Sequence, residues 1–528
     1  MATALSCLFF MLLVGGYAWR ATRGQTHTSD GYFLAGHGLS GTFIAGSLLL
    51  TNLSAEQLIG LNGSAYAYNL SSMAWEVTAA VAIVFMALVL APRYLAGGFT
   101  TLPEFLESRF DARVRRATAL LFLLGYGLVT IPSVLYSGSL ALLQLIDVPG
   151  WLGLDRSGAL IVTVWAVGLV GAAYAIIGGL KAVAVSDTLN GIGLLVIGVT
   201  VPALGLAELG DGSILAGLTF LTSNHTEKLD AIGGPGDPTP FGTLFTGMIL
   251  ANLFYWGTNQ YVIQRTLGAS SLAEGQKGVL ISGLFKILVP FFMMIPGVIA
   301  FHLYGPGLAS MDDAYPRLVE DVLPGYLSGF FLAVLLGAVF SSFNSLLNSA
   351  STLFAMDLLR PWRPALGDAS LIRAARLFGV VLALFSFLVA PLLQYAPEGL
   401  WQFIRKFTGF YNVPIVAIVL IAVFTRRSRL RVPPAAALWA IGFHLLAYGV
   451  LTFLWDSGIH FIHVYALLFG AEVMIMLAFA RRRSEPAPAP RDAAIDMTPW
   501  RHARAFSVFL LALMVAVYVL FSGLGLAR

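Results

Sequence analysis

Residues 51–63 read TNLSAEQLIGLNG, and residues 251–265 read ANLFYWGTNQYVIQR. Each stretch places Asn, Gln, Gly and hydroxyl or aromatic groups inside a run that is otherwise Leu, Ile and Ala. Backbone that leaves the helical hydrogen-bond pattern is tolerated at membrane depth only where it lines a cavity or is buried in protein. A corresponding pair of interrupted hydrophobic segments is typical of inverted-repeat transporters. The pattern predicts two broken helices at a binding site; hydrogen bonding between intact helices is the alternative.

The composition indicates that nearly the whole chain lies in a membrane. Of 528 residues, 58% are hydrophobic and 11% are charged, whereas about a quarter of the residues of a soluble domain are charged. Apolar stretches of about 20 residues can cross a hydrocarbon core of about 30 Å. They predict an all-α polytopic membrane protein with about 14 transmembrane helices. The predicted spans are residues 3–19, 40–62, 72–92, 117–146, 157–178, 184–209, 240–262, 278–303, 323–356, 374–395, 399–424, 433–455, 459–480 and 505–526.

The charges predict the orientation of these spans. With the N-terminus outside, most Lys and Arg fall in cytoplasmic loops, as the positive-inside rule requires, and an even number of spans puts the C-terminus outside as well. The basic clusters are Arg109, Arg113, Arg115 and Arg116, then Arg426, Arg427, Arg429 and Arg431, then residues 481–483. This loop placement argues against a nucleic-acid surface despite the net charge of +4. The single Cys7 excludes a disulfide framework.

Three parts are expected along the chain. Residues 1–37 hold the first transmembrane helix and a cytoplasmic loop, and residues 38–426 hold the ten-helix transport core. Residues 427–528 hold three C-terminal helices, with a Pro/Ala-rich cytoplasmic linker at about 484–500. The longest extramembrane stretch, about residues 210–239, has too little apolar content for a core of its own.

Ionisable residues inside predicted spans are the next signal, and they include Glu76, Lys286, Arg405 and Lys406. A charge at the centre of a membrane helix costs about 3 kcal/mol to insert, so such residues are found in ion pairs, cavities or functional sites. A purely structural ion pair is one interpretation. Together with the broken helices, the charges favour a hydrated cavity of the size of a sugar, lined by hydrogen-bond donors and acceptors.

Five longer motifs resemble the sodium:solute symporters, and within them most closely a bacterial sodium/galactose symporter and the animal sodium/glucose cotransporters. The resemblance spans about residues 30–430. It is carried by NLSAEQLIG (52–60), TLPEFLESRF (101–110), YAIIGGLKAVAVSD (174–187), NLFYWGTNQYVIQRTL (252–267) and SSFNSLLNSASTLFAMDL (341–358). The resemblance implies a five-plus-five inverted-repeat, leucine-transporter-like core with flanking helices, located in the inner (plasma) membrane of a bacterium.

The resemblance also implies a sodium site. Its oxygen ligands would be the backbone carbonyls of Leu50, Leu53 and Ala338 and the hydroxyls of Ser341 and Ser342. A hard cation prefers oxygen ligands, and a broken helix provides unpaired carbonyls. Ala338, Ser341 and Ser342 are spaced to share one helical face. Hydrogen bonding of the hydroxyls to the preceding helical turn is the alternative.

The implied sugar-binding residues are Asn52, Gln57, Glu76, Asn252, Tyr255, Trp256, Lys286 and Arg405. Amides and carboxylates can bridge adjacent sugar hydroxyls, and an aromatic face supports the C–H side of the ring. The resemblance also implies that Tyr255 is the inner gate, an aromatic side chain that closes the path of the sugar to the cytoplasm. A second ion path would involve Asp187 and Ser345, although Asp187 also fits a carboxylate satisfied locally at a helix end.

Arg405 departs from the galactose symporters, which have a glutamine there. A guanidinium adds a permanent planar set of donors to the cavity. Arg405 either pairs with Glu76, which leaves a site for a neutral sugar, or contacts a carboxylate on an acidic sugar. Retention of Glu76 favours the neutral sugar, because its charge would repel an anion.

We therefore expect sodium-coupled symport of a neutral, galactose- or glucose-like monosaccharide by alternating access. The alternatives are a symporter for an inositol, a sialic acid, a uronic acid or an amino acid, a proton-driven carrier, and a non-transporting sugar sensor or passive channel on the same scaffold. An enzyme is not expected, because no nucleophile–base pair, phosphate loop or metal triad stands out.

Overall fold

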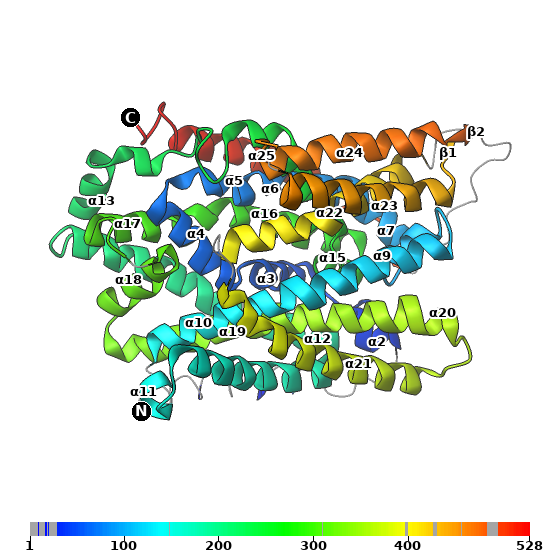
Figure 1. The fold of residues 1–528 in the computed structure, drawn as a ribbon, viewed down its shortest axis with the longest axis horizontal. Coiled ribbons are helices and arrows are strands. Elements are labelled where there is room, and N and C mark those ends of the chain that lie inside the picture. The colour runs from blue at the N-terminus through cyan, green and yellow to red at the C-terminus, as the bar shows by residue number, and fades with distance from the viewer. Residues whose placement is uncertain are drawn as a thin grey trace.

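The computed structural model describes residues 29–146, 148–308, 310–395, 400–425, 430–455, 457–482 and 495–528, together with residues 9, 16, 17 and 20. Most of its helices run along the horizontal axis of Figure 1. The elements are α2 (Ser29–Leu34), η1 (Ala35–His37), α3 (Gly41–Asn52), α4 (Ala55–Ala67), η2 (Leu70–Met73), α5 (Ala74–Val77), α6 (Ala79–Phe85), η3 (Met86–Leu90), α7 (Ala91–Gly97), α8 (Leu102–Glu107), α9 (Ala112–Gly125), η4 (Tyr126–Thr130), α10 (Ile131–Leu145), α11 (Val148–Leu152), α12 (Arg156–Leu209), α13 (Ile214–Ser223), η5 (Thr226–Leu229), η6 (Phe241–Phe245), α14 (Gly247–Leu253), η7 (Phe254–Thr258), α15 (Gln260–Leu267), α16 (Leu272–Met293), α17 (Ile295–Tyr304), η8 (Met311–Asp313), α18 (Ala314–Val322), α19 (Gly325–Leu353), η9 (Phe354–Leu359), α20 (Arg360–Trp362), α21 (Asp368–Val389), η10 (Ala390–Tyr395), α22 (Leu400–Phe424), β1 (Leu430–Arg431), α23 (Pro434–Gly449), η11 (Val450–Leu454), α24 (Phe461–Ala478), β2 (Arg481–Arg482) and α25 (Ala503–Leu520).

The described residues contain ten helices that are long and apolar enough to cross a membrane, or eleven if α3 and α4 count as one bent span. The predicted all-α membrane fold is confirmed, whereas the predicted count of 14 is not. The predicted first span, residues 3–19, lies largely outside the described residues. Predicted span 240–262 is divided among short helices, and α12 is one continuous helical run over the two predicted spans 157–178 and 184–209.

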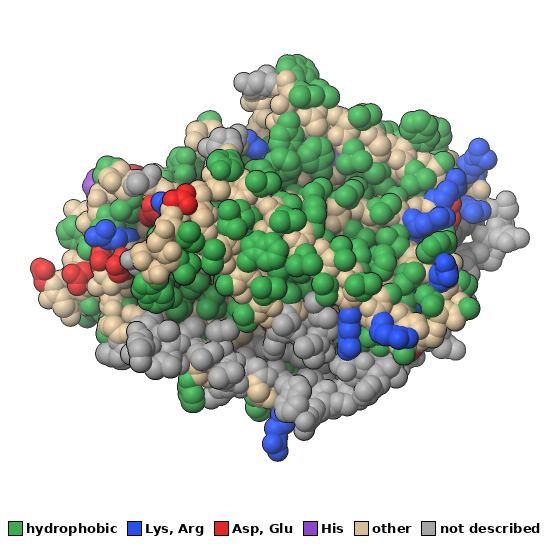
Figure 2. All heavy atoms as spheres, turned by 60° about the horizontal axis from the view of Figure 1, so that its bottom comes forward, with side chains coloured by type: hydrophobic (Ala, Val, Ile, Leu, Met, Phe, Trp, Pro, Cys, Tyr) green, Lys and Arg blue, Asp and Glu red, His purple; other side chains and the backbone are tan. Residues whose placement is uncertain are grey.

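The charged side chains gather at opposite ends of the molecule. Figure 2 shows Lys and Arg mainly at the end that holds α20, β1 and β2, and Asp and Glu mainly at the other end, with apolar side chains between them. The exposed acids at that other end include Glu320 and Asp321. This separation agrees with the predicted orientation, in which the basic end faces the cytoplasm.

The first predicted break is present between α3 and α4, whose axes differ by 56°. Leu53 leaves the helical conformation, and the side chain of Ser54 accepts a hydrogen bond from the backbone of Gln57, which caps α4. The amide of Ser54 donates to the carbonyl of Asn52 at 2.9 Å, and not to that of Leu50 four residues earlier. The turn therefore releases the Leu50 carbonyl from the helical pattern.

The second predicted break lies at the end of the π-helix η7. Asn259 is extended, with φ −73° and ψ 117°, and it separates η7 from α15. Its amide donates to the carbonyl of Phe254 at 2.8 Å, which closes the π-helical turn. π-Helical turns of this kind are frequent at functional sites.

Close helix packing holds the broken helices in place. A side-chain carbon added to Gly297 on α17 would lie 2.1 Å from the backbone carbonyl of Asn62 on α4, and the amide of Gly297 donates to the Asn62 side chain at 2.8 Å. Small residues allow such close approach between membrane helices. The second half of the first broken helix, α4, is therefore packed directly against α17.

Part of the predicted cytoplasmic linker is anchored to the core. The amide of Leu272 at the start of α16 donates to the carbonyl of Asp496 at 2.9 Å, and the amide of Trp500 donates to the side chain of Gln276 at 2.8 Å. These contacts connect the segment before α25 to the first turns of α16. The predicted domain boundaries themselves stay predictions.

Candidate functional site

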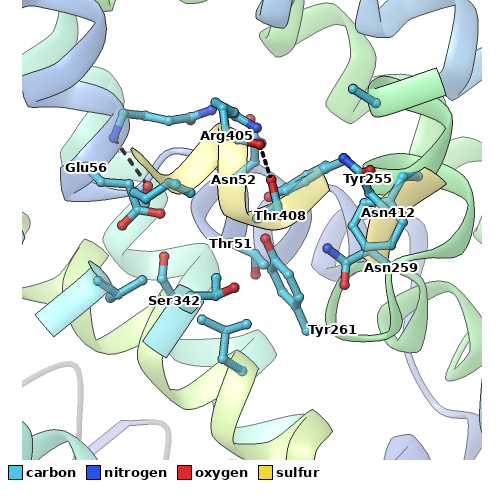
Figure 3. A pocket seen from close by; sticks show the side chains of 18 of the residues that line it. Thr51, Asn52, Glu56, Tyr255, Asn259, Tyr261, Ser342, Arg405, Thr408 and Asn412 are labelled. Atoms are coloured by element: carbon cyan, nitrogen blue, oxygen red, sulfur yellow. Dashed lines mark hydrogen bonds between the residues drawn. The ribbon is translucent and has the colours of Figure 1, made fainter. Parts of the chain in front are cut away.

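A cavity lies where the breaks of α3–α4 and η7–α15 meet α19 and α22 (Figure 3). Four of the predicted sugar-binding residues, Asn52, Gln57, Tyr255 and Arg405, line this cavity together with Ser342 from the predicted sodium site. Its other polar or aromatic lining residues are Thr51, Ser54, Glu56, Trp75, Thr130, Phe254, Asn259, Tyr261, Thr408, Tyr411 and Asn412.

Glu76 and Lys286 lie beside the cavity in a closed polar cluster. Both side chains are buried, and they form an ion pair. Gln57 donates to the other Glu76 oxygen at 3.0 Å, and Lys286 also donates to the side chain of Asn52. The pair thus fixes the amides of Gln57 and Asn52, which do reach the cavity.

Two further predicted sugar-binding residues are engaged with the protein. Asn252 donates to the hydroxyl of Thr78 at 2.9 Å. Trp256 is buried and packs against Tyr255, with ring centroids 5.6 Å apart. Neither Asn252 nor Trp256 lines the cavity directly. In this structure they support Tyr255 and the wall behind it.

The guanidinium of Arg405 lies 4.5 Å from the ring centroid of Trp75. The structure shows Glu76 paired with Lys286, and Arg405 lines the same cavity as Glu56. Stacking on the indole face fixes the plane of the Arg405 guanidinium. The carbonyl of Arg405 accepts hydrogen bonds from Thr408 at 3.0 Å and Tyr465 at 2.6 Å.

The predicted sodium ligands lie on α3, at the break that follows it and on α19, and Ser342 lines the cavity with Asn52 and Ser54. Leu50, Leu53, Ala338, Ser341 and Ser342 are all buried, on α3, at the break and on the face of α19. In the described part of the chain, the Ser342 hydroxyl has no hydrogen-bond partner, and the Ser341 hydroxyl lies beside the Asp187 carboxylate. The predicted alternative, bonding to the preceding turn, is therefore not what this geometry contains. An unpartnered buried hydroxyl suits a small cation that prefers oxygen ligands.

The predicted second ion path contains a buried cation of the protein itself. Arg265 lies between Asp187 and Ser345: its Nη2 is 4.0 Å from the Asp187 carboxylate and also donates to the Ser345 hydroxyl. Ser47 donates to Asp187 at 2.7 Å, and Ser341 lies close to the same carboxylate. Asp187 is therefore linked to the predicted sodium residues through Ser341.

Sequence reasoning missed Glu56 and Arg265, although both stand in the two stretches that predicted the breaks. Glu56 is an acid inside the first stretch and has one buried oxygen, Oε2, without a hydrogen-bond partner. Arg265 is completely buried. A charged residue within an otherwise uncharged span indicates a functional site, and this pattern could have identified both residues. Asn259, Tyr261 and Asn412 carry no such charge, and only the fold brings them to the cavity.

The family model of the sodium:solute symporter family matches residues 32–441. The chain belongs to the sodium:solute symporter family. This symporter is 45% identical over 97% of its length to an uncharacterized symporter, YidK, of Escherichia coli, 90% of which is covered. It is 28% identical over 98% of its length to a sodium/glucose cotransporter of Vibrio parahaemolyticus, 96% of which is covered.

A solved structure shares the fold. The substrate-bound, outward-open structure of a sodium-coupled sialic acid symporter matches with a TM-score of 0.76 and 22% sequence identity, covering 91% of this chain and 98% of that one. The symporter therefore has the inverted-repeat architecture predicted from its broken helices. It is a multi-pass membrane transporter that couples a small-molecule substrate to sodium.

Proposed function

We propose that the chain imports a neutral monosaccharide, galactose- or glucose-like, by sodium-coupled symport across a bacterial inner membrane, with both termini outside. One observation carries the proposal. Amide, carboxylate and guanidinium groups converge on a single cavity, and Ser342 of the predicted sodium site borders the same cavity. The sodium/glucose function named for the Vibrio relative supports a sugar substrate.

Binding of sodium at the first break provides the coupling in this proposal. The ion would take oxygens from Leu50, Leu53, Ala338, Ser341 and Ser342 and fix the angle between α3 and α4. Asn52 and Gln57, which start from that same break, would then be oriented toward the sugar. Mutual stabilisation of two ligands is commonly worth about 1–3 kcal/mol. Asp187, with Arg265 and Ser345, would lie on the path by which the ion leaves.

Tyr255 would close the cavity toward the cytoplasm. It lines the cavity next to the second break and makes edge contacts with Trp256 and Tyr261. Rocking of the two repeats would move this aromatic cluster aside and release both ligands inward. An inositol or an acidic sugar is the alternative substrate, and a sugar sensor is the alternative from another class.

Uptake into proteoliposomes with an inward sodium gradient tests the proposal. We expect sodium-dependent accumulation of labelled galactose or glucose, and we expect Ser342→Ala to raise the sodium concentration for half-maximal uptake by about tenfold. Loss of one oxygen ligand weakens a site that holds the ion through few contacts. Ser328→Ala, which removes a hydroxyl from the outer end of α19, is the matched control and should behave as wild type.

Each other outcome is informative. Accumulation of only an inositol or an acidic sugar would replace the substrate and keep the coupling. Sodium-dependent binding of a sugar without flux would favour the sensor. Uptake that ignores sodium would contradict the proposal.

A further inference from the structure

Asn259 at the second break has a side chain that the break itself does not use. The residue directly precedes α15, a position from which Asn commonly caps a helix with its side-chain oxygen, but α15 receives no side-chain cap. The backbone of Asn259 forms the break instead. Its carbonyl accepts hydrogen bonds from the amides of Val262 and Ile263 at 3.0 Å each, and its amide donates to Phe254 at 2.8 Å. The side chain is therefore available for another role.

The Asn259 side chain is held by a hydroxyl from another span. The hydroxyl of Tyr126, in the π-helix η4, donates to Asn259 Oδ1 at 2.5 Å, and the amide of Tyr261 donates to the same hydroxyl at 3.2 Å. Because the Tyr126 oxygen already accepts from Tyr261, its own hydrogen is left for Asn259. This arrangement identifies the atom that faces Tyr126 as the amide oxygen. The NH2 group of Asn259 is therefore directed away from Tyr126.

This NH2 group is a hydrogen-bond donor at the substrate cavity. Asn259 is buried and lines the cavity, and in the described part of the chain the one hydrogen-bond partner of its side chain is Tyr126. Figure 3 shows Asn259 with Tyr261 and Asn412 on the side of the cavity away from Glu56. A buried donor without a partner is unfavourable, so the NH2 group indicates a ligand that accepts from it.

The chemistry of an NH2 group selects between the two ligands of a sodium symporter. Sodium takes oxygen ligands, and an amide NH2 donates hydrogen bonds but accepts none. In this orientation Asn259 does not suit the ion. A sugar hydroxyl has an oxygen that accepts from such a donor. Asn52 and Gln57 reach the same cavity from the first break, so the substrate would meet amide groups from both broken helices.

We propose that Asn259 is a further substrate-binding residue, whose NH2 group donates to one hydroxyl oxygen of the sugar, and that Tyr126 is the positioning residue that sets this orientation. The proposal rests on the proposed function and adds a contact at the same site. A single neutral hydrogen bond changes affinity by about two- to tenfold. Asn259 would therefore give specificity for one hydroxyl of the sugar, while the remaining hydroxyls are bound by other residues.

Monodeoxy and monofluoro derivatives of glucose and galactose, each altered at one hydroxyl, test this contact. Their competition with the labelled parent sugar for sodium-driven uptake in proteoliposomes gives an apparent affinity for each derivative. In wild type, removal of the hydroxyl that Asn259 contacts should lower the affinity by about five- to tenfold. The fluoro derivative at that position should bind better than the deoxy one, because fluorine still accepts weakly. In Asn259→Ala the penalty should fall to about twofold or less, and the penalties at other positions should persist.

Tyr126→Phe tests the positioning role. The Asn259 amide then loses the partner of its oxygen, and we expect the penalty at the same hydroxyl to fall to about threefold or less. Asn224→Ala, at an exposed Asn, and Tyr315→Phe, at a buried hydroxyl without a hydrogen-bond partner in the described chain, are the matched controls and should keep the wild-type pattern. Thermal unfolding in detergent checks that each variant folds. If Tyr126→Phe does not fold, Asn259→Ala still tests the contact.

The outcomes separate a contact from a structural role. Equal loss of affinity for every derivative in Asn259→Ala, or an unchanged pattern, would overturn the contact. Equal penalties for the deoxy and fluoro derivatives at the hydroxyl that Asn259→Ala identifies would overturn the assigned orientation. An unchanged penalty in a folded Tyr126→Phe would overturn its positioning role.

Binding keeps this inference apart from the proposed function. The same derivatives are titrated against purified protein in sodium, with the shift of the thermal midpoint as the readout. If wild type binds the sugars without sodium-driven flux, the proposed function fails, and the pattern of binding still decides the role of Asn259. If wild type neither transports nor binds them, both proposals fail.

Discussion

Glu76 and Lys286 show what a buried charge does at this site. The two residues are enclosed and paired, and Gln57 and Asn52 complete their hydrogen bonds. Burying two charges is unfavourable, and their attraction balances the cost only when the geometry and the remaining hydrogen bonds are satisfied. The pair therefore holds two amides at the cavity without adding net charge to it.

We predict that either single variant, Glu76→Gln or Lys286→Met, destabilises the protein by about 3–5 kcal/mol, because each leaves its partner charged and unpaired. The double variant Glu76→Gln/Lys286→Met should be less destabilised than the worse single variant. Thermal unfolding in detergent, followed by intrinsic fluorescence, measures the order of the midpoints. A double variant that loses the sum of the single effects would contradict the pairing.

The residues of the site could be predicted only in part. Asn52, Gln57, Tyr255 and Arg405 line the cavity as expected, because each stands in or next to a polar interruption of a span. For Glu76 and Lys286, contact with the sugar and a structural ion pair were both interpretations; the structure shows the pair, which depends on the approach of α5 and α16. Nothing local in the sequence reports that approach. The role of each site residue stays a prediction.

At the scale of elements, the C-terminal helices hold α22. Tyr465 of α24 donates to the carbonyl of Arg405 at 2.6 Å, and Tyr448 of α23 donates to that of Lys406 at 2.7 Å. The buried His444 also bonds to the carbonyl of Gly409 at 3.0 Å, and its other ring nitrogen is paired with Glu472. These helices lie outside the predicted core, and they fix the helix that presents Arg405.

We predict that Tyr465→Phe raises the apparent KM for the sugar by about two- to tenfold, since one hydrogen bond is worth about 0.5–1.5 kcal/mol. The maximal rate should change less, because Arg405 is still present but less well fixed. Tyr518→Phe is the matched control, because the hydroxyl of Tyr518 has no hydrogen-bond partner in the described chain. Equal effects of the two substitutions on KM would show that Tyr465 does not position α22.

The helix breaks could be predicted from the sequence because the residues that cause them lie at the breaks themselves. Polar interruptions at residues 51–63 and 251–265 located both breaks, since caps such as Ser54 and extended residues such as Asn259 act within one turn. The number of spans was less predictable. Hydropathy treats residues 240–262 as one apolar span, whereas η6, α14, η7 and α15 divide it according to contacts made in the fold.

The molecule separates its exposed charges along its longest axis and pairs charges in its interior. Basic side chains lie mainly at one end and acidic ones at the other (Figure 2). Inside, Glu76 with Lys286 and Asp187 with Arg265 give two pairs of opposite charges. A transport core that is balanced in this way moves no fixed charge of these groups when it reorients.

Transport of a neutral sugar should therefore carry only the charge of sodium. A potential of about 100 mV, inside negative, contributes about 2.3 kcal/mol for each sodium ion, and we predict that it strongly stimulates wild-type sugar uptake. Without sodium, the same potential should have little effect on uptake, because no other charge moves with the sugar. Valinomycin-imposed potassium potentials in proteoliposomes measure both responses. Equal stimulation with and without sodium would contradict sodium as the charge that moves with the sugar.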